Sequence, residues 1–232
     1  MTTVGTTNTF NRELWLKKTL QEIPAGLRVL DAGAGEQRYR QYCTHLNYVS
    51  LDFGEYDGKG DGTGLQTGVW DQRNLDIICD ITSIPEPDGA FDVIMCIEVF
   101  EHLPDPLAAL KEFARLIRSG GQLILTAPFC SLTHFAPYHY YTGFNKYFYE
   151  AHLPVRGFQV EELVENGNYF EYLAQEVRRI PSVAAQYANT RPTMFDLLIL
   201  RLVLSMLNRF IRRDKGSSAL LHYGCFIKAI KI

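Results

Sequence analysis

Short apolar runs alternate with amphipathic stretches over roughly the first 130 residues of the chain. The apolar runs predict strands at 28–32, 48–52, 76–80, 91–97 and 122–127. The run at 91–97 is continuously apolar, as expected of a strand that is covered on both faces. Amphipathic stretches predict helices at 11–22 and 104–118, the second ended by Gly120 and Gly121. Strands that alternate with helices in this way indicate a parallel α/β sheet.

The pattern changes after Pro128. Residues 134–149 are dense in aromatic side chains and carry no clear period. A sixth strand is predicted at 158–163, and a seventh, antiparallel and at or near the end of the sheet, at 223–232. Between them, 168–215 reads as a mostly helical insertion.

The predicted fold is a Rossmann-like α/β fold with a seven-stranded, mostly parallel sheet, an antiparallel last strand and a helical cap insertion. We predict a core domain over 1–165, a helical cap over 166–218, and a last strand over 219–232 that returns to the core sheet.

Two glycines, Gly33 and Gly35, directly follow the first predicted strand. At this position the backbone N–H groups approach a ligand closely, although a plain structural turn also explains such a pair. Asp52 ends the next strand, 21 residues after Asp31. A carboxylate there accepts hydrogen bonds from ribose hydroxyls, so the combination favours a nucleoside-type cofactor.

The residues around the turn favour a cationic ligand over a dinucleotide. Asp31 precedes the glycines, and Glu36, Gln37 and Arg38 follow them without a third glycine. Glu36 close to a pyrophosphate is repelled, whereas an acidic residue suits a ligand with an amino group and a sulfonium.

Five stretches carry a wider likeness: VLDAGAGEQRY (29–39), YVSLD (48–52), ICDI (78–81), FDVIMCIEVFEHLPDP (91–106) and RLIRSGGQLILTAPF (115–129). In order and spacing the chain resembles the class I S-adenosylmethionine-dependent methyltransferases, of the methyltransferase type 11 kind. The stretches cover about residues 20–130 and are specific to the superfamily, not to a substrate. The sequence departs from the pattern at Gln37, where many members have a third glycine.

The resemblance implies S-adenosylmethionine as the cofactor. The residues implied to contact it are Asp31, Gly33, Gly35, Asp52, Phe53, Asp80, Ile81, Cys96 and Ile97. Asp31 and the glycines then line the methionine and ribose end, and Asp52 takes the ribose hydroxyls. Phe53 flanks the adenine, while Cys96 and Ile97 act largely through their backbone. Asp80 lies at the adenine edge, or alternatively caps the turn before Thr82.

Two histidines are candidates for a general base, which methyl transfer to a hydroxyl of high pKa requires. His102 follows the fourth strand, where a structural role in orienting the loop is the stronger interpretation. His139 follows the fifth strand, with His134, Tyr140 and Tyr141 as candidate substrate contacts. Open α/β sheets bind ligands outside the carboxyl ends of their strands. His134 and His139 fit no familiar zinc spacing, so no metal is expected.

The favoured function is O-methylation of a small-molecule acceptor, with a sugar or glycan precursor preferred because of the HYYT-like loop at 139–142. One alternative is methylation of a lipophilic ring such as a quinone precursor. Another is a cofactor-binding protein without transfer activity.

The segment 193–213 predicts an amphipathic helix that begins with a capping box of Thr193 and Asp196. Helical-wheel arithmetic places nine of its apolar side chains on one broad face, made of Leu197, Ile199, Leu200, Val203, Leu204, Met206, Leu207, Phe210 and Ile211. Such a helix covers the core or a second copy of the chain in a homodimer, which we favour, or else contacts a membrane peripherally.

The charge, the start of the sequence and the cysteines indicate which partners and which compartment to expect. The formal net charge of −3 argues against a general nucleic-acid partner, because phosphate binding needs a basic surplus. The start of the sequence shows no signal peptide, and the five cysteines form no C-x-x-C pair. We therefore expect a cytoplasmic protein with reduced thiols.

Overall fold

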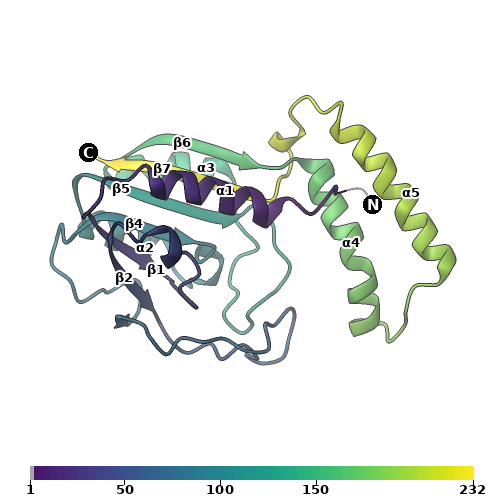
Figure 1. The fold of residues 1–232 in the computed structure, drawn as a ribbon, viewed down its shortest axis with the longest axis horizontal. Helices are drawn as coiled ribbons and strands as arrows, with labels where there is room; N and C mark the ends of the chain where they lie inside the picture. The colour runs from purple at the N-terminus through teal and green to yellow at the C-terminus, as the bar shows by residue number, and fades with distance from the viewer. Residues whose placement is uncertain (1–2) are drawn as a thin grey trace. The chain divides into compact units, whose positions relative to one another are not determined.

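The computed structural model describes residues 3–232 (Figure 1). Its seven strands form one sheet in the order β3-β2-β1-β4-β5-β7-β6. Their bounds are β1 Arg28–Ala32, β2 Asn47–Asp52, β3 Ile77–Ile78, β4 Phe91–Ile97, β5 Ile117–Pro128, β6 Phe158–Asn166 and β7 Gly224–Lys231. Neighbouring strands from β3 to β5 pair in parallel, and β7 pairs with β5 in the antiparallel direction. The predicted fold class is confirmed.

Five α-helices are described: α1 Asn8–Gln21, α2 Pro106–Leu116, α3 Lys146–His152, α4 Tyr169–Tyr187 and α5 Met194–Ile211. The side chain of Asp105 caps α2 by accepting hydrogen bonds from the amides of Leu107 and Ala108, at 3.0 and 2.9 Å. The apolar face of α2 is buried in the main core together with the residues of β4 and β5. This packing fixes the carboxyl ends of β4 and β5, where the candidate site lies.

Three local predictions were wrong. The third strand shrinks from 76–80 to Ile77–Ile78, because the carboxylate of Asp76 turns to the amide and hydroxyl of Ser50, at 2.8 and 2.7 Å. The predicted helix 104–118 ends at Leu116, and β5 starts at once. Gly120 and Gly121 therefore lie inside a strand, near a register shift against β4.

The aromatic-rich segment forms one element that the pattern did not predict. Residues 146–152 form α3, which begins at Asn145, whose side chain accepts from the amides of Tyr147 and Phe148. Tyr149 is fully buried and belongs to the main core. The aromatic density therefore reflects packing on the sheet as well as a loop.

The chain divides into two compact units. One comprises Leu16–Val164 and Gly224–Ile232 and holds most of the sheet. The other comprises the segment up to Trp15 and Glu165–Tyr223, and within it α4 packs on α5 around Ala174 and Leu207. That 166–218 caps the core stays a prediction.

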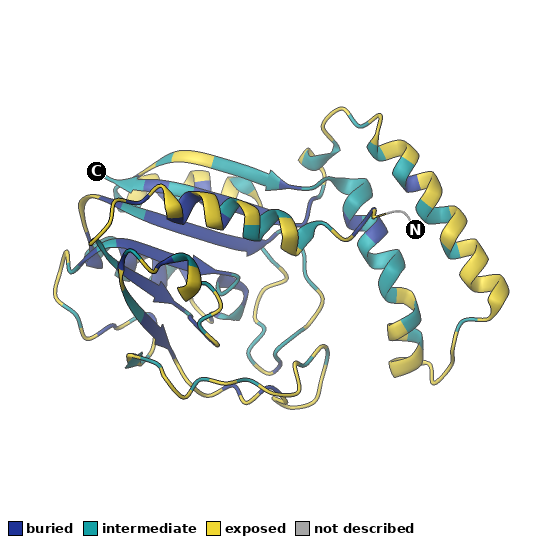
Figure 2. Cartoon of the chain, viewed as in Figure 1, coloured by how far each residue is buried: buried dark blue, intermediate teal, exposed yellow. Residues whose placement is uncertain are grey.

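The start of α5 is as predicted. Asp196 N donates to Thr193 Oγ1 at 3.2 Å, and Asp196 Oδ2 accepts from Thr193 N at 2.8 Å, which completes a capping box. The single apolar face was wrong. Leu207 is buried and its neighbours Leu204 and Ile211 are half-buried, but Phe195, Leu198 and Leu202 are exposed. Figure 2 colours most of α5 as exposed.

No helix within residues 3–232 has an apolar stretch of the length needed to cross a lipid bilayer.

Candidate functional site

The turn after β1 has the backbone that its glycines predict. Gly33 and Gly35 have φ values of +85° and +50°, in the left-handed region that favours glycine. A Cβ on Gly33 would lie 2.4 Å from a methyl carbon of Val99, so only glycine fits there. Gln37 also has a positive φ, +56°. The departure from a third glycine therefore keeps a glycine-like conformation, and the Gln37 side chain donates to the carbonyl of Asn74.

Asp52 ties this turn to the end of β2. Its side chain is buried, and its Oδ2 accepts a hydrogen bond from the amide of Gly35 at 2.9 Å. Its Oδ1 accepts from the amide of Gly54 at 3.2 Å and from the side chain of Gln72 at 2.8 Å. Asp52 is therefore held in place from two sides, one of them the glycine-rich segment 53–73.

Asp31 is the second buried carboxylate. The hydroxyl of Tyr48 donates to its Oδ2 at 2.6 Å. Burial raises the pKa of Asp31 to about 7, and the nearby charge of Asp52 adds to this rise, while the Tyr48 hydrogen bond opposes it. The carboxyl group is thus poised to ionise near neutral pH.

The other predicted cofactor contacts lie where their strands end. Phe53 is partly exposed, and its ring meets that of Tyr138 edge to face at 4.9 Å. Asp80 is exposed, and its Oδ1 accepts from the amide and hydroxyl of Thr82, both at 2.8 Å, which is the capping alternative. Three further side chains are buried, so any contact runs through the backbone: Ile81, Cys96 and Ile97.

The glycine-rich segment connects this turn to the loop after β5. Trp70 lies against Gly35, where a Cβ would be 2.5 Å from its ring. The Trp70 ring contacts Phe135 edge to face at 5.2 Å, and Phe135 stacks on His102 at 5.1 Å. The backbone of Leu65 bonds to both Thr133 and Phe135. A continuous series of contacts therefore connects the turn after β1 to the histidines, and their shared role in one site stays a prediction.

The three predicted histidines come together. The ring centroids of His102 and His134 are 4.6 Å apart, those of His134 and His139 4.8 Å, and those of His102 and His139 5.9 Å. The Nδ1 atoms of His102 and His134 contact the carbonyls of Tyr138 and Leu132, at 2.6 and 2.8 Å. Because a carbonyl only accepts, each Nδ1 carries the hydrogen when the ring is neutral, and each Nε2 carries the lone pair.

His139 has the opposite tautomer. The Ser131 hydroxyl donates to the carbonyl of Thr142 at 2.9 Å, so its oxygen accepts from His139 Nε2 at 3.1 Å. The lone pair of neutral His139 then lies on Nδ1. Burial and the neighbouring His134 hold the pKa of His139 below its usual value. Burial, again with His134, lowers the pKa of His102 to about 3.

Sequence reasoning missed two glutamates of the EVFEH motif. Glu101 is buried, and its Oε1 lies 3.8 Å from Nε2 of both His102 and His134. These three residues offer ligand atoms within 4.8 Å of one another, and the prediction that no metal binds stays a prediction. Glu98 accepts from the hydroxyl of Thr126 at 2.8 Å and has a φ of +57°, a strained value for glutamate that often marks a functional position.

The two candidate substrate tyrosines lie at the edge of this cluster. The amides of Tyr140 and Tyr141 donate to the carbonyl of Glu101, at 2.9 and 3.2 Å. Both side chains are exposed, and the hydroxyl of Tyr141 donates to the carbonyl of Pro104. Their position suits contact with an incoming molecule, and their role in binding substrate stays a prediction.

Comparison with known proteins shows what the chain is similar to. Residues 30–125 match the family model described as a methyltransferase domain. The chain is 32% identical over 105 residues to a ubiquinone biosynthesis O-methyltransferase of Xanthomonas oryzae pv. oryzae. This match covers 44% of the chain and 43% of the relative, so the chain spans less than half the length of the curated relative. The predicted resemblance to class I methyltransferases is confirmed.

Solved structures share the fold at low identity. A putative methyltransferase from Bacillus halodurans is 16% identical, with a TM-score of 0.55, over 95% of this chain and 99% of that one. A Haemonchus contortus phosphoethanolamine N-methyltransferase 2, solved with S-adenosyl-L-methionine, is 18% identical, with a TM-score of 0.53, over 95% of this chain and 52% of that one. The Haemonchus structure holds the cofactor that the sequence predicts.

Proposed function

We propose, from the premise that residues 30–125 form a class I methyltransferase domain, that the chain methylates a hydroxyl of a small lipophilic ring of the quinone-precursor kind. The observation that carries the proposal is the continuity of the cofactor turn with the aromatic and histidine cluster through Trp70 and Phe135. The comparisons give no support to the sugar acceptor that the sequence favoured. The relative from Xanthomonas is an O-methyltransferase of ubiquinone biosynthesis, which suits the ring alternative.

The residues present fit S-adenosylmethionine. Gly33 and Gly35 add no side chain of their own to the turn, and the buried carboxylates of Asp31 and Asp52 offer acceptors for ribose hydroxyls and for positive charge. When bound, the cofactor supplies an electrophilic methyl group on a sulfonium. The chain therefore has to hold both reactants in line, keep water out and take up one proton.

The histidine cluster provides the proton acceptor. His139 Nδ1 takes the proton of the acceptor hydroxyl, while Ser131 holds the ring through Nε2. With that proton removed, the acceptor oxygen would take the methyl group that the cofactor supplies, and sulfur would keep the electron pair of its bond to that carbon. The products are a methyl ether and S-adenosylhomocysteine. The aromatic rings of Tyr56, Trp70 and Phe135 pack together beside this cluster and supply an apolar wall for a ring substrate.

The test is turnover with two acceptor classes. The full chain is incubated with S-adenosylmethionine and either a catechol that carries a prenyl chain or a nucleotide-linked hexose. We expect S-adenosylhomocysteine and a ring methyl ether, detected by mass spectrometry, with the catechol only. Turnover with the hexose alone would instead support the sugar acceptor. Cofactor binding in calorimetry without turnover of either acceptor would favour a non-catalytic cofactor-binding protein.

A further inference from the structure

The α5 helix has a second apolar face that nothing within its own unit covers among the described residues. Its first face packs on α4, around Leu207. The second is an exposed stripe with helical spacing, hereafter the α5 stripe, made of Phe195, Leu198, Leu202 and Met206, which are 70%, 52%, 62% and 41% exposed. Figure 2 shows most of α5 as exposed. A contiguous apolar surface of this kind marks an interaction site.

The α5 stripe becomes cationic toward the end of the helix. Arg209 and Arg213 follow Met206 at the same spacing of three and four residues, and both are exposed. Over residues 188–223 the sequence has six arginines and lysines against two aspartates, a surplus of four on a chain whose net charge is −3. The positive charge is therefore concentrated here.

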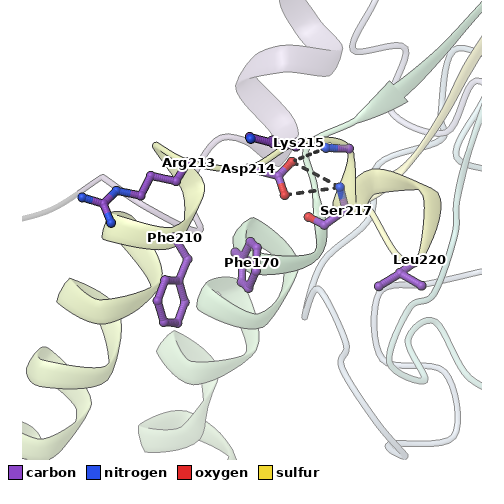
Figure 3. A pocket seen from close by; sticks show the side chains of 8 residues that line it. Phe170, Phe210, Arg213, Asp214, Lys215, Ser217 and Leu220 are labelled. Carbon is purple, nitrogen blue, oxygen red and sulfur yellow. Dashed lines mark hydrogen bonds between the residues drawn. The ribbon is translucent and has the colours of Figure 1, made fainter.

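A hollow of about 520 Å³ lies at this cationic end (Figure 3). The rings of Phe170 and Phe210 form part of its lining, 5.5 Å apart, and Arg213 and Lys215 also line it. Leu220, another lining residue, is 73% exposed. One carboxylate, that of Asp214, lines the hollow too and accepts from the amides of Gly216 and Ser217. The hollow thus combines apolar walls with two cationic side chains and one anionic one, and this net positive lining suits an anionic head group attached to apolar chains.

We infer that the α5 stripe binds the surface of an anionic lipid bilayer. The apolar side chains enter the boundary of the acyl region, and Arg209, Arg213 and Lys215 meet the head-group phosphates. A second copy of the chain matches the stripe poorly. Parallel packing of two α5 helices sets arginine against arginine, and antiparallel packing sets the arginines against the apolar end.

The test is sedimentation of the full chain with vesicles. We expect binding to vesicles of phosphatidylglycerol and phosphatidylcholine in equal parts, weakened by added salt, and little binding to phosphatidylcholine alone. The double variant Leu198→Asp, Leu202→Asp should stay folded, because both side chains are exposed, and bind at least about tenfold more weakly. Arg209→Glu with Arg213→Glu should have a similar effect.

Matched controls separate this surface from general charge and apolarity. Lys59→Glu with Lys111→Glu changes the net charge by the same amount as Arg209→Glu with Arg213→Glu. Val155→Asp adds an aspartate in place of another apolar side chain, one that is 76% exposed. Both controls should keep vesicle binding. If the aspartate pair misfolds, Leu198→Gln with Leu202→Gln repeats the test with neutral side chains.

Three results would overturn the inference. The first is a wild-type protein that does not bind anionic vesicles. The second is a stripe variant that binds them as tightly as the wild type does. The third is a wild type that is dimeric without lipid and a stripe variant that is monomeric in sedimentation velocity, since a second copy would then be the occupant. None of these readouts involves methyl transfer, so failure here leaves the proposed function untouched.

Discussion

The side-chain amide of Gln72 donates a 2.8 Å hydrogen bond to Oδ1 of Asp52. The proposed function assigns the ribose hydroxyls to this same carboxylate, whose other oxygen already accepts from Gly35. Gln72 and Trp70 belong to one segment, and Trp70 lies against Gly35. That segment therefore contacts both Asp52 and Gly35, to which the proposed function also assigns the cofactor. When the cofactor binds, its own contacts should replace those of Gln72 and Trp70.

Removing the Gln72 amide should raise cofactor affinity. The hydrogen bond that must be given up has a charged acceptor and contributes roughly 1.5–3 kcal/mol, so Gln72→Ala should bind S-adenosylmethionine at least about tenfold more tightly in calorimetry. Gln41→Ala is the matched control, because Gln41 is exposed and bonds only locally to the carbonyl of Arg38. Weaker binding by Gln72→Ala would mean that Gln72 instead holds the segment in its binding arrangement.

Loss of the Asp52 carboxylate should weaken binding. Hydrogen bonds to a charged acceptor are worth roughly 1.5–3 kcal/mol each, so Asp52→Ala should lower the affinity for S-adenosylmethionine at least about tenfold. Asp52→Asn keeps an oxygen for the amide of Gly35 and checks whether the turn itself has moved. Thermal unfolding tests that the fold is intact. Unchanged affinity in calorimetry would remove Asp52 from the site.

Cofactor affinity should depend on pH through Asp31. Its pKa is raised to about 7, chiefly by burial, and a cationic ligand favours the ionised carboxylate. Affinity for S-adenosylmethionine should therefore rise between about pH 6 and 8. Asp31→Asn should lose this part of the dependence, and comparing the two proteins cancels the titration of the cofactor's own amino group. Identical pH profiles in calorimetry would contradict the assignment.

Acid should destabilise the core unit through His102. The pKa of its buried ring is lowered to about 3, against an ordinary value of 6.5, so the unfolded chain takes up a proton first as the pH falls. This contribution to stability is fully present above about pH 6.5 and is lost at about 1.4 kcal/mol per pH unit toward pH 3. Urea unfolding at several pH values should show that the free energy of unfolding falls less steeply with decreasing pH in His102→Asn than in the wild type. The same pH dependence of the unfolding free energy in both proteins would contradict a lowered pKa for His102.

The sequence predicted those features of the site that depend on local spacing along the chain. Gly33, Gly35 and Asp52 stand at fixed distances from apolar runs, so period and spacing were enough to place them at the ends of β1 and β2. The contacts of Gln72 and Trp70 depend on how a glycine-rich segment folds back, which no local pattern encodes. The strain at Glu98 is likewise a property of the folded backbone.

The α5 helix shows a different limit. Its capping box was predicted because the two residues interact three positions apart. The wheel placed nine apolar side chains on one face and left out Phe195, Leu198 and Leu202, whereas α4 covers only the side around Leu207. Which apolar side chains of a helix are covered depends on the helix packed against it. The sequence pattern of the first helix alone therefore does not predict them.

The last prediction concerns the base. Since burial and His134 hold the pKa of His139 below its usual value, its neutral form dominates at neutral pH, and the rate should fall only below about pH 6.5. His139→Ala should lower kcat by about 10²-fold with little change in cofactor affinity, and added imidazole should restore part of the rate. Ser131→Ala should lower kcat less, because it removes only the partner that orients the ring. His102→Ala should mainly affect stability, since its Nδ1 contacts the carbonyl of Tyr138 and its pKa of about 3 makes it a weak base. If kcat instead collapses in His102→Ala and survives in His139→Ala, the proton goes to His102.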